Sequence, residues 1–259
     1  MTHPVAQTPA AVTAAPRFET SRVDLRAPFR WLRNGIDDFR QIPGLSLLYG
    51  GIFAALCFGV YALMQTVPWY GLGYLTGLVV IGPFLASGLY VASRDLEQRV
   101  QPSIGGTLRL LAQRATYLGL FSVLLALVMA AWVRFSALVF AFHFSTLSPT
   151  AQAYTSLLSS PDGWAVLGLF FGIGFLLAAV VFVISATAIP LILDKDVDFV
   201  TAMQTSYRAV TRNPAPMALW AASIVAITAL GLATLFVGLA VFFPVLGYAT
   251  WHSYRDLVK

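Results

Sequence analysis

The sequence predicts an all-α integral membrane protein with six transmembrane helices, arranged as three parallel repeats of an amphipathic helix followed by two spans. Three observations support this prediction: the composition, the spacing of long apolar segments and the distribution of basic residues. Of the 259 residues, 58% are hydrophobic and only 10% are charged, and the mean hydropathy is +0.78. A soluble domain carries about 25% charged residues, so this composition is typical of a polytopic membrane protein.

The six spans follow from the apolar segments. A helix needs about 20 apolar residues to cross the hydrocarbon core of a bilayer. Four segments meet this requirement singly, and the run over residues 215–254 is long enough for two spans joined by a tight turn at 235–238. They form one transmembrane domain over residues 27–259, and residues 1–26 are predicted to be a disordered cytoplasmic tail. The predicted spans cover residues 44–64, 71–93, 117–135, 164–193, 215–235 and 238–254.

The basic residues fix the orientation of these spans. With six spans, 15 of the 16 Lys and Arg residues fall on one side of the membrane, and the two loops around residues 65–70 and 145–164 hold none. The positive-inside rule therefore places both termini in the cytoplasm. The same bias explains the pI of about 9.6 without a nucleic-acid partner. The remaining basic residue, Arg134, lies near the outer end of the third span, where it either extends its charge to the interface or contacts an anionic lipid or ligand.

A short cytoplasmic segment with helical periodicity precedes each pair of spans. Pro28 suits the first position of the first helix, and Asp198 or Asp196 can cap the third. Amphipathic helices with arginine on the polar face lie in the headgroup plane, either as elbows that orient the next span or as surfaces for lipids or partners. The apolar residues at helical spacing are Phe29, Leu32, Ile36 and Phe39 in the first segment, Ile104, Leu108, Leu111 and Ala115 in the second, and Phe199, Met203 and Val210 in the third.

The ends of the second and sixth spans repeat each other. Residues 77–96, GLVVIGPFLASGLYVASRDL, align without a gap with residues 238–257, GLAVFFPVLGYATWHSYRDL. The alignment places Pro83 on Pro244, and the fourth span carries Pro190 in a similar position. Each predicted copy begins and ends in the cytoplasm, so the three copies are related by an axis along the membrane normal.

These three prolines are the candidate functional residues. Each frees a backbone carbonyl about four residues back and can kink its helix. Small residues beside them, including Gly82 and Gly247, permit either close helix packing or a cavity between kinked spans. Both interpretations remain open at the level of the sequence.

The polar residues give little support for catalysis, so the sequence predicts no enzyme, no cofactor and no bound metal. No Asp, Glu or Lys lies within a predicted span, which argues against ion-coupled transport. The three carboxylates of DKDVDF at 194–199 are interpreted as a helix start rather than a Mg²⁺ site. The remaining polar and aromatic residues at the inner ends of the spans are interpreted as interfacial. These are Trp31, Tyr207, Trp251, His252 and Tyr254.

Four segments carry a resemblance to a known family. They are WLRNGIDDFRQIPGLSLLYG at 31–50, GPFLASGLYVASRDLE at 82–97, SYRAVTRNPAPMALW at 206–220 and FPVLGYATWHSYRDLV at 243–258. Through them the sequence resembles a family of uncharacterised bacterial integral membrane proteins, catalogued as domain of unknown function 2189. The resemblance implies a six-helix protein of the bacterial inner membrane and supplies no activity.

The expected function is that of a non-enzymatic inner-membrane component that assists the assembly, organisation or regulation of other membrane components. Its expected partners are the lipid bilayer and other membrane proteins. The alternative is an uncoupled transporter or channel for a small apolar or amphipathic solute, lined by the proline-containing even-numbered spans. A cavity between those spans would favour the alternative.

Overall fold

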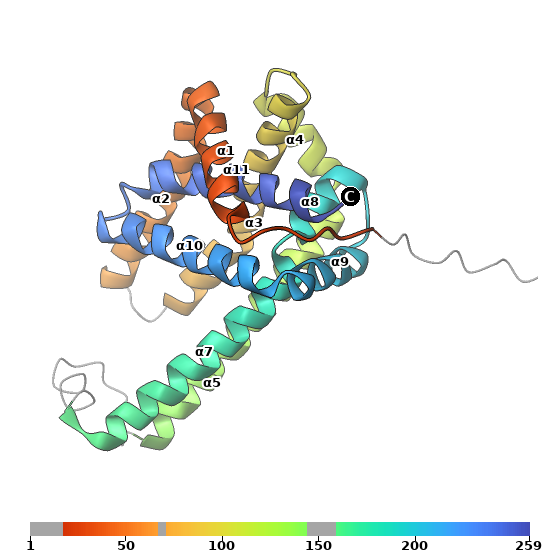
Figure 1. The fold of residues 1–259 in the computed structure, drawn as a ribbon. Helices are drawn as coiled ribbons and strands as arrows, with labels where there is room; N and C mark the ends of the chain where they lie inside the picture. The colour runs from red at the N-terminus through yellow and green to blue at the C-terminus, as the bar shows by residue number, and fades with distance from the viewer. Residues whose placement is uncertain (1–17, 67–70, 144–158) are drawn as a thin grey trace, which may run out of the picture.

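The computed structural model describes residues 18–66, 71–143 and 159–259, which are almost entirely helical (Figure 1). Within these residues the only β-type pairing is a single bridge between Thr20 and Val258, so the all-α fold class is confirmed. The helices are α1 (Ala27–Gln41), α2 (Pro43–Thr66), α3 (Gly71–Glu97), α4 (Ile104–Gln113), α5 (Ala115–His143), α7 (Pro161–Ser185), α8 (Ala188–Lys195), α9 (Phe199–Arg212), α10 (Pro214–Ala233) and α11 (Leu239–Leu257).

Four of these segments are long and apolar enough to cross a membrane. They are α2, the first 25 residues of α5, the segment Pro161–Lys195 that contains α7 and α8, and α10. Helices α3 and α11 occupy the predicted second and sixth spans and are 27 and 19 residues long, but they are not among the four. The turn predicted at 235–238 lies between α10 and α11, where Leu235 and Phe236 both adopt a positive φ.

The three predicted amphipathic segments are the helices α1, α4 and α9, which immediately precede α2, α5 and α10. Asp198 caps α9, because its carboxylate accepts the amides of Val200 and Thr201 at 3.0 Å. A further hydrogen bond from the Thr201 hydroxyl lowers the pKa of this carboxyl group. On α1, the stripe residues Phe29 and Ile36 are exposed, as a helix facing the bilayer interface requires.

Helix α11 lies at the centre of the molecule, against α1, α2, α3 and α10 (Figure 1). Glycines on the neighbouring helices allow this close approach. A Cβ atom added at Gly35 of α1 would lie 2.6 Å from the carbonyl oxygen of Val245, and one added at Gly50 of α2 would overlap the backbone of Ala240. The side chains of α11 itself therefore face protein on most sides, with Tyr248 and Trp251 among the largest buried groups.

Helices α5 and α7 form a hairpin that projects away from this body, toward the lower left of Figure 1. The two helices pack against each other for much of their length. In the most apolar 18-residue window of α7 and α8, no residue is buried. The hairpin therefore presents an apolar surface that the rest of the described chain leaves uncovered.

The predicted fourth span, 164–193, is broken rather than continuous. Helix α7 ends at Ser185 and α8 begins at Ala188. The hydroxyl of Ser206, on α9, accepts the Thr187 amide at 3.3 Å and donates to the Val183 carbonyl at 2.9 Å. The Ser206 hydroxyl thus replaces the helical hydrogen bond that the Thr187 amide would otherwise donate to the Val183 carbonyl. Pro190 then falls in the first turn of α8, where its missing amide has no intrahelical acceptor to lose.

We expect Ser206→Ala to destabilise the protein by about 1–3 kcal/mol, because the buried Thr187 amide loses its acceptor. A proline at 190 prevents the segment from closing into one straight helix instead. The measurement is thermal unfolding of the purified protein in detergent. Ser223→Ala is the matched control, since the Ser223 hydroxyl only donates to Leu219 within its own helix. Equal melting temperatures for the two variants would refute this account of the break.

Residues 18–26 were predicted to belong to the disordered tail, but the structure gives them defined contacts. The Ser21 amide donates to the Leu257 carbonyl at 2.9 Å, and the Lys259 amide donates to the Glu19 carbonyl at 3.0 Å. The Asn213 side chain accepts the Val23 amide and donates to the Ser21 carbonyl. The beginning of the described chain therefore lies beside its C-terminal residues. Residues 1–17 and the centres of the two predicted outer loops lie outside the described residues.

Candidate functional site

The three candidate prolines lie on three different helices. Pro244 is buried inside α11, and the carbonyl that it leaves without an amide partner, that of Ala240, faces Gly50 of α2. Pro190 is buried in the first turn of α8. Pro83 lies within α3. Pro244 thus lies at a close helix contact and Pro190 directly after a helix break, and a kink at these positions stays a prediction.

The other candidate residues are also separate from one another. Gly247 packs closely on α3, where an added Cβ atom would lie 2.6 Å from a Leu89 methyl group. Gly82 has no neighbour within 4 Å of such an atom. Arg134 is exposed on the projecting part of α5. These positions favour a packing role for Gly247 and do not bring the candidate residues into one site.

A buried polar cluster joins α1, α3 and α11. The Asp38 carboxylate accepts the Ser93 hydroxyl at 2.5 Å and lies 2.9 Å from His252 Nε2. One turn earlier on α11, the Tyr248 hydroxyl donates to Ser46 at 2.8 Å, because Ser46 itself donates to a backbone carbonyl. His252 is therefore a partly buried partner of a carboxylate. Sequence analysis missed this pairing because Asp38 and His252 are 214 residues apart.

The interfacial interpretation of three aromatic residues is wrong. Trp31, Trp251 and Tyr254 are only 0%, 1% and 1% exposed. Each buries its ring and donates its polar hydrogen to a carboxylate. The three bonds are Trp31 to Asp256 at 2.7 Å, Trp251 to Glu97 at 3.2 Å and Tyr254 to Asp194 at 2.7 Å. Tyr207, the fourth aromatic residue of that set, is exposed.

Ionic contacts extend this arrangement along the end of α11. Arg255 contacts Glu97 at 3.1 Å and Asp194 at 3.9 Å, and Asp256 contacts Arg30 at 3.8 Å. The predicted helix-start carboxylates also have separate partners, since Asp196 pairs with Arg114 and Asp198 caps α9. Within the described ranges, no three His, Cys, Asp or Glu side chains gather as a metal site would require. The contacts hold α3, α8 and α11 together.

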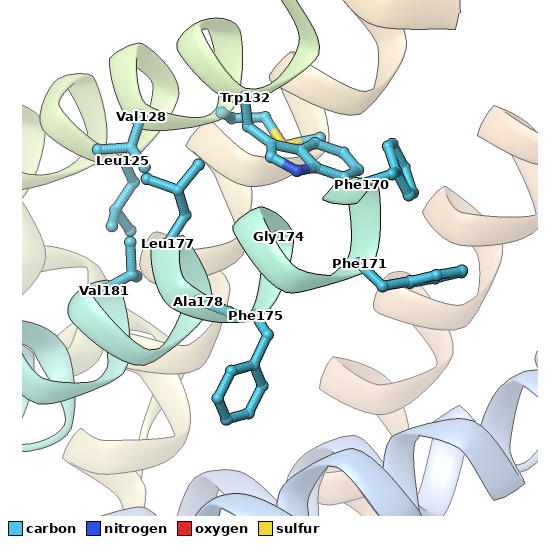
Figure 2. Close-up of a pocket in the computed structure, with 11 residues that line it drawn as sticks. Leu125, Val128, Trp132, Phe170, Phe171, Gly174, Phe175, Leu177, Ala178 and Val181 are labelled. Carbon is cyan, nitrogen blue, oxygen red and sulfur yellow. The ribbon is translucent and has the colours of Figure 1, made fainter. Parts of the chain in front are cut away.

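Three apolar cavities lie along α7. One is a groove of about 600 Å³ between α5 and α7, where Figure 2 shows Trp132 above Gly174 and beside Phe170. The Trp132 and Phe170 rings are 5.2 Å apart, and the Trp132 indole nitrogen is buried without a hydrogen-bond partner among the described residues. Two further cavities, of about 860 and 350 Å³, lie where α7 meets α9 and α10. None of these three cavities is lined by a candidate proline, Gly82, Gly247 or Arg134.

Sequence analysis also missed a small-residue motif on α7. Gly168 and Gly172 are both exposed, and no atom lies within 4 Å of a Cβ atom added at either. The neighbouring Phe171 and Phe175 are 65% and 72% exposed. A G-x-x-x-G pattern within an apolar segment of about 20 residues marks a face for helix association. This G-x-x-x-G pattern is visible in the sequence, so the surface could have been predicted from it.

The fold defines the class to which the protein belongs, an integral membrane protein with several apolar helices. Most of the surface of the hairpin formed by α5 and α7 is free to meet lipid or other proteins. Residues 72–194 match the family described as "Predicted integral membrane protein (DUF2189)". The resemblance found in the sequence is therefore confirmed for this segment, which includes α3, α4, α5 and α7. No curated protein and no solved structure matches the chain.

Proposed function

We propose that the protein is a non-enzymatic component of the bacterial inner membrane that assists the assembly or organisation of other membrane proteins. It does so by binding a transmembrane helix of a partner on the exposed face of α7. The observation that carries the proposal is the open face at Gly168 and Gly172. It lies on α7, and none of the 18 most apolar consecutive residues of α7 and α8 is buried.

A partner helix suits this face better than a lipid chain does. Two glycines one turn apart allow two helix backbones to approach closely and make Cα–H···O contacts. Phe171 and Phe175 stand beside this slot and supply dispersion contacts with a partner's side chains. No helix of this chain among the described residues occupies the slot, since no atom comes within 4 Å of the Cβ positions.

The proposed arrangement in the membrane is six spans in three parallel repeats with both termini in the cytoplasm. Its support is the order of the helices, in which α1, α4 and α9 each precede a pair of long helices. The hydrogen bonds between residues 19–21 and 257–259 agree with termini on one side. The 15 basic residues on that side then follow the positive-inside rule.

The experiment replaces both glycines with leucine in the full chain and places a photoreactive amino acid at exposed Leu169. In membranes of the native bacterium, we expect the wild-type face to crosslink to one membrane protein, whose complex becomes less abundant when the gene is deleted. Wild type and the control Gly59→Leu, an open glycine on α2, restore that complex, whereas Gly168→Leu/Gly172→Leu does not.

Two outcomes would overturn the proposal, provided that the variants retain the wild-type melting temperature. The first is a double variant that restores the complex as well as the wild type does. The second is crosslinking only between copies of this chain, which would assign the face to self-association. The transporter alternative is less well supported, because only one of the three even-numbered spans, the fourth through its helix α7, lines any of the three cavities.

A further inference from the structure

We propose that the cavity between α7 and α10 binds an anionic phospholipid, with an acyl chain in the cavity and the phosphate on Arg208 and Arg212 of α9. The cavity lies on the same side of α7 as Gly168 and Gly172, but closer to the C-terminal end of that helix. The inference does not depend on the proposed function, since a lipid site at this position requires no protein partner.

The cavity has the dimensions and lining of a site for one acyl chain. Its volume is about 860 Å³, and its two walls are apolar. Along α10 it runs from Pro214 to Ala226, which is about 18 Å at 1.5 Å per residue. This length is close to half of the hydrocarbon thickness of about 30 Å, the depth of a single leaflet. The walls include Phe175, Ala178 and Phe182 from α7, and Met217, Ala221 and Val225 from α10.

One end of the cavity is polar and basic. Thr211 lines this end, and Arg208 and Arg212 lie on α9 on either side of it in the sequence. The adjoining cavity of about 350 Å³ is lined by Gln204, Tyr207 and Arg208. The smaller cavity thus offers a guanidinium group, a hydroxyl and an amide donor to a phosphate group and its ester oxygens. Arg212 is exposed and follows Thr211 directly in the sequence.

The charge of these arginines is not neutralised within the described chain. Arg208 is partly buried, and its Nε atom has no hydrogen-bond partner among the described residues, although a terminal nitrogen donates to Thr205 at 3.2 Å. The carboxylates that precede α9 are engaged elsewhere: Asp194 with Tyr254, Asp196 with Arg114, and Asp198 with the first amides of α9.

An anion joined to an apolar chain complements this combination. The buried Arg208 Nε atom carries an energetic penalty that a phosphate removes by accepting a charge-assisted hydrogen bond. A free phosphate would satisfy the arginines and leave the adjacent apolar cavity empty. A neutral lipid would fill the cavity and leave the arginines without a negative partner. The combined surface therefore selects an anionic phospholipid, the lipid class that attracts basic segments at membrane surfaces.

The test uses the full-length protein in detergent, with lipid binding measured by native mass spectrometry at graded phosphatidylglycerol concentrations. We expect preferential binding of one phosphatidylglycerol over phosphatidylcholine, and a loss of affinity of about tenfold or more in Arg208→Gln/Arg212→Gln. The control is Arg26→Gln/Arg33→Gln, at the N-cap of α1 and within it, which removes the same charge from two exposed arginines. Ala221→Phe fills the cavity without changing any charge, and we expect it to weaken binding as well.

Three results would each overturn the proposal. One is equal affinity for phosphatidylglycerol and phosphatidylcholine. Another is an equal effect of the two arginine pairs, which would indicate a general attraction to positive charge. The last is displacement of the lipid by millimolar inorganic phosphate together with unchanged binding in Ala221→Phe, which would indicate a phosphate site alone. Variants are compared only where their thermal unfolding matches that of the wild type.

Discussion

Replacing Gly50 by alanine is expected to destabilise the protein by about 3 kcal/mol or more, because the new methyl group would overlap the backbone of Ala240. The obstructing atoms belong to the main chain of α11, so no side-chain rotation can make room. Helices α2 and α11 must then separate, and both pack on α3. We expect a large fall in the melting temperature and loss of a monodisperse species in size-exclusion chromatography.

Gly51→Ala is the matched control for this prediction. No atom lies within 4 Å of a Cβ atom added at Gly51, and alanine favours the helix over glycine by about 1 kcal/mol. The Gly51 variant should therefore be as stable as the wild type or slightly more stable. The same substitution at two adjacent glycines of one helix would then change the stability in opposite directions. If both variants unfold at the same temperature, the close approach of α2 to α11 is not present in the protein.

The position of Gly50 is linked to Pro244. The proline leaves the Ala240 carbonyl without its usual amide donor, and Gly50 is the residue of α2 that lies against this carbonyl. The Cα–H group of a glycine can approach a carbonyl oxygen closely and donate a weak hydrogen bond to it. Pro244, the kink position predicted from the sequence, thus lies where α11 packs on α2.

Removing the side chain of Trp31 is expected to cost about 3–5 kcal/mol, the range for a large aromatic residue cut back to alanine in a core. The ring is fully buried and lies edge-on to Trp220 at 5.7 Å between centroids. Its indole nitrogen donates to Asp256 at 2.7 Å. Trp31→Ala therefore removes the packing of α1 on α10 and the hydrogen bond to α11. Thermal unfolding in detergent measures the loss.

Two further variants separate packing from hydrogen bonding. Trp31→Phe keeps most of the ring contact and removes the indole donor. Because Asp256 is partly exposed and has Arg30 at 3.8 Å, we expect this variant to lose only about 1 kcal/mol. Trp164, which is 61% exposed on α7, is the control, and its replacement by alanine should change the melting temperature little. A Trp31→Ala variant as stable as Trp164→Ala would contradict the burial of Trp31.

Local patterns in the sequence predicted the elements of the fold well. The periodic apolar residues of α1, α4 and α9 and the cap at Asp198 depend on residues within a few positions of each other. The long apolar segments predicted α2, α5 and α10 for the same reason. Such features are set by helix geometry, which acts over three or four residues.

Features that depend on distant residues could not be predicted. The burial of Trp31 requires a carboxylate 225 residues away, and the break after α7 requires the Ser206 hydroxyl on another helix. The sequence does not distinguish Gly50 from Gly51, although only Gly50 faces the backbone of another helix. The arginines of α9 contributed only to the orientation of the spans, because their carboxylate-free surroundings appear only when the chain is folded.

The central place of α11 has a consequence for the order of folding. This helix follows all its partners among the described helices, and about 200 residues separate the end of α1 from the start of α11. Until α11 is synthesised, α1 lacks the helix on which it mainly packs, and the Trp31 indole lacks its acceptor Asp256. Contacts of such long sequence separation form late and slowly. The packing of α1 is therefore completed only after α11 has been inserted.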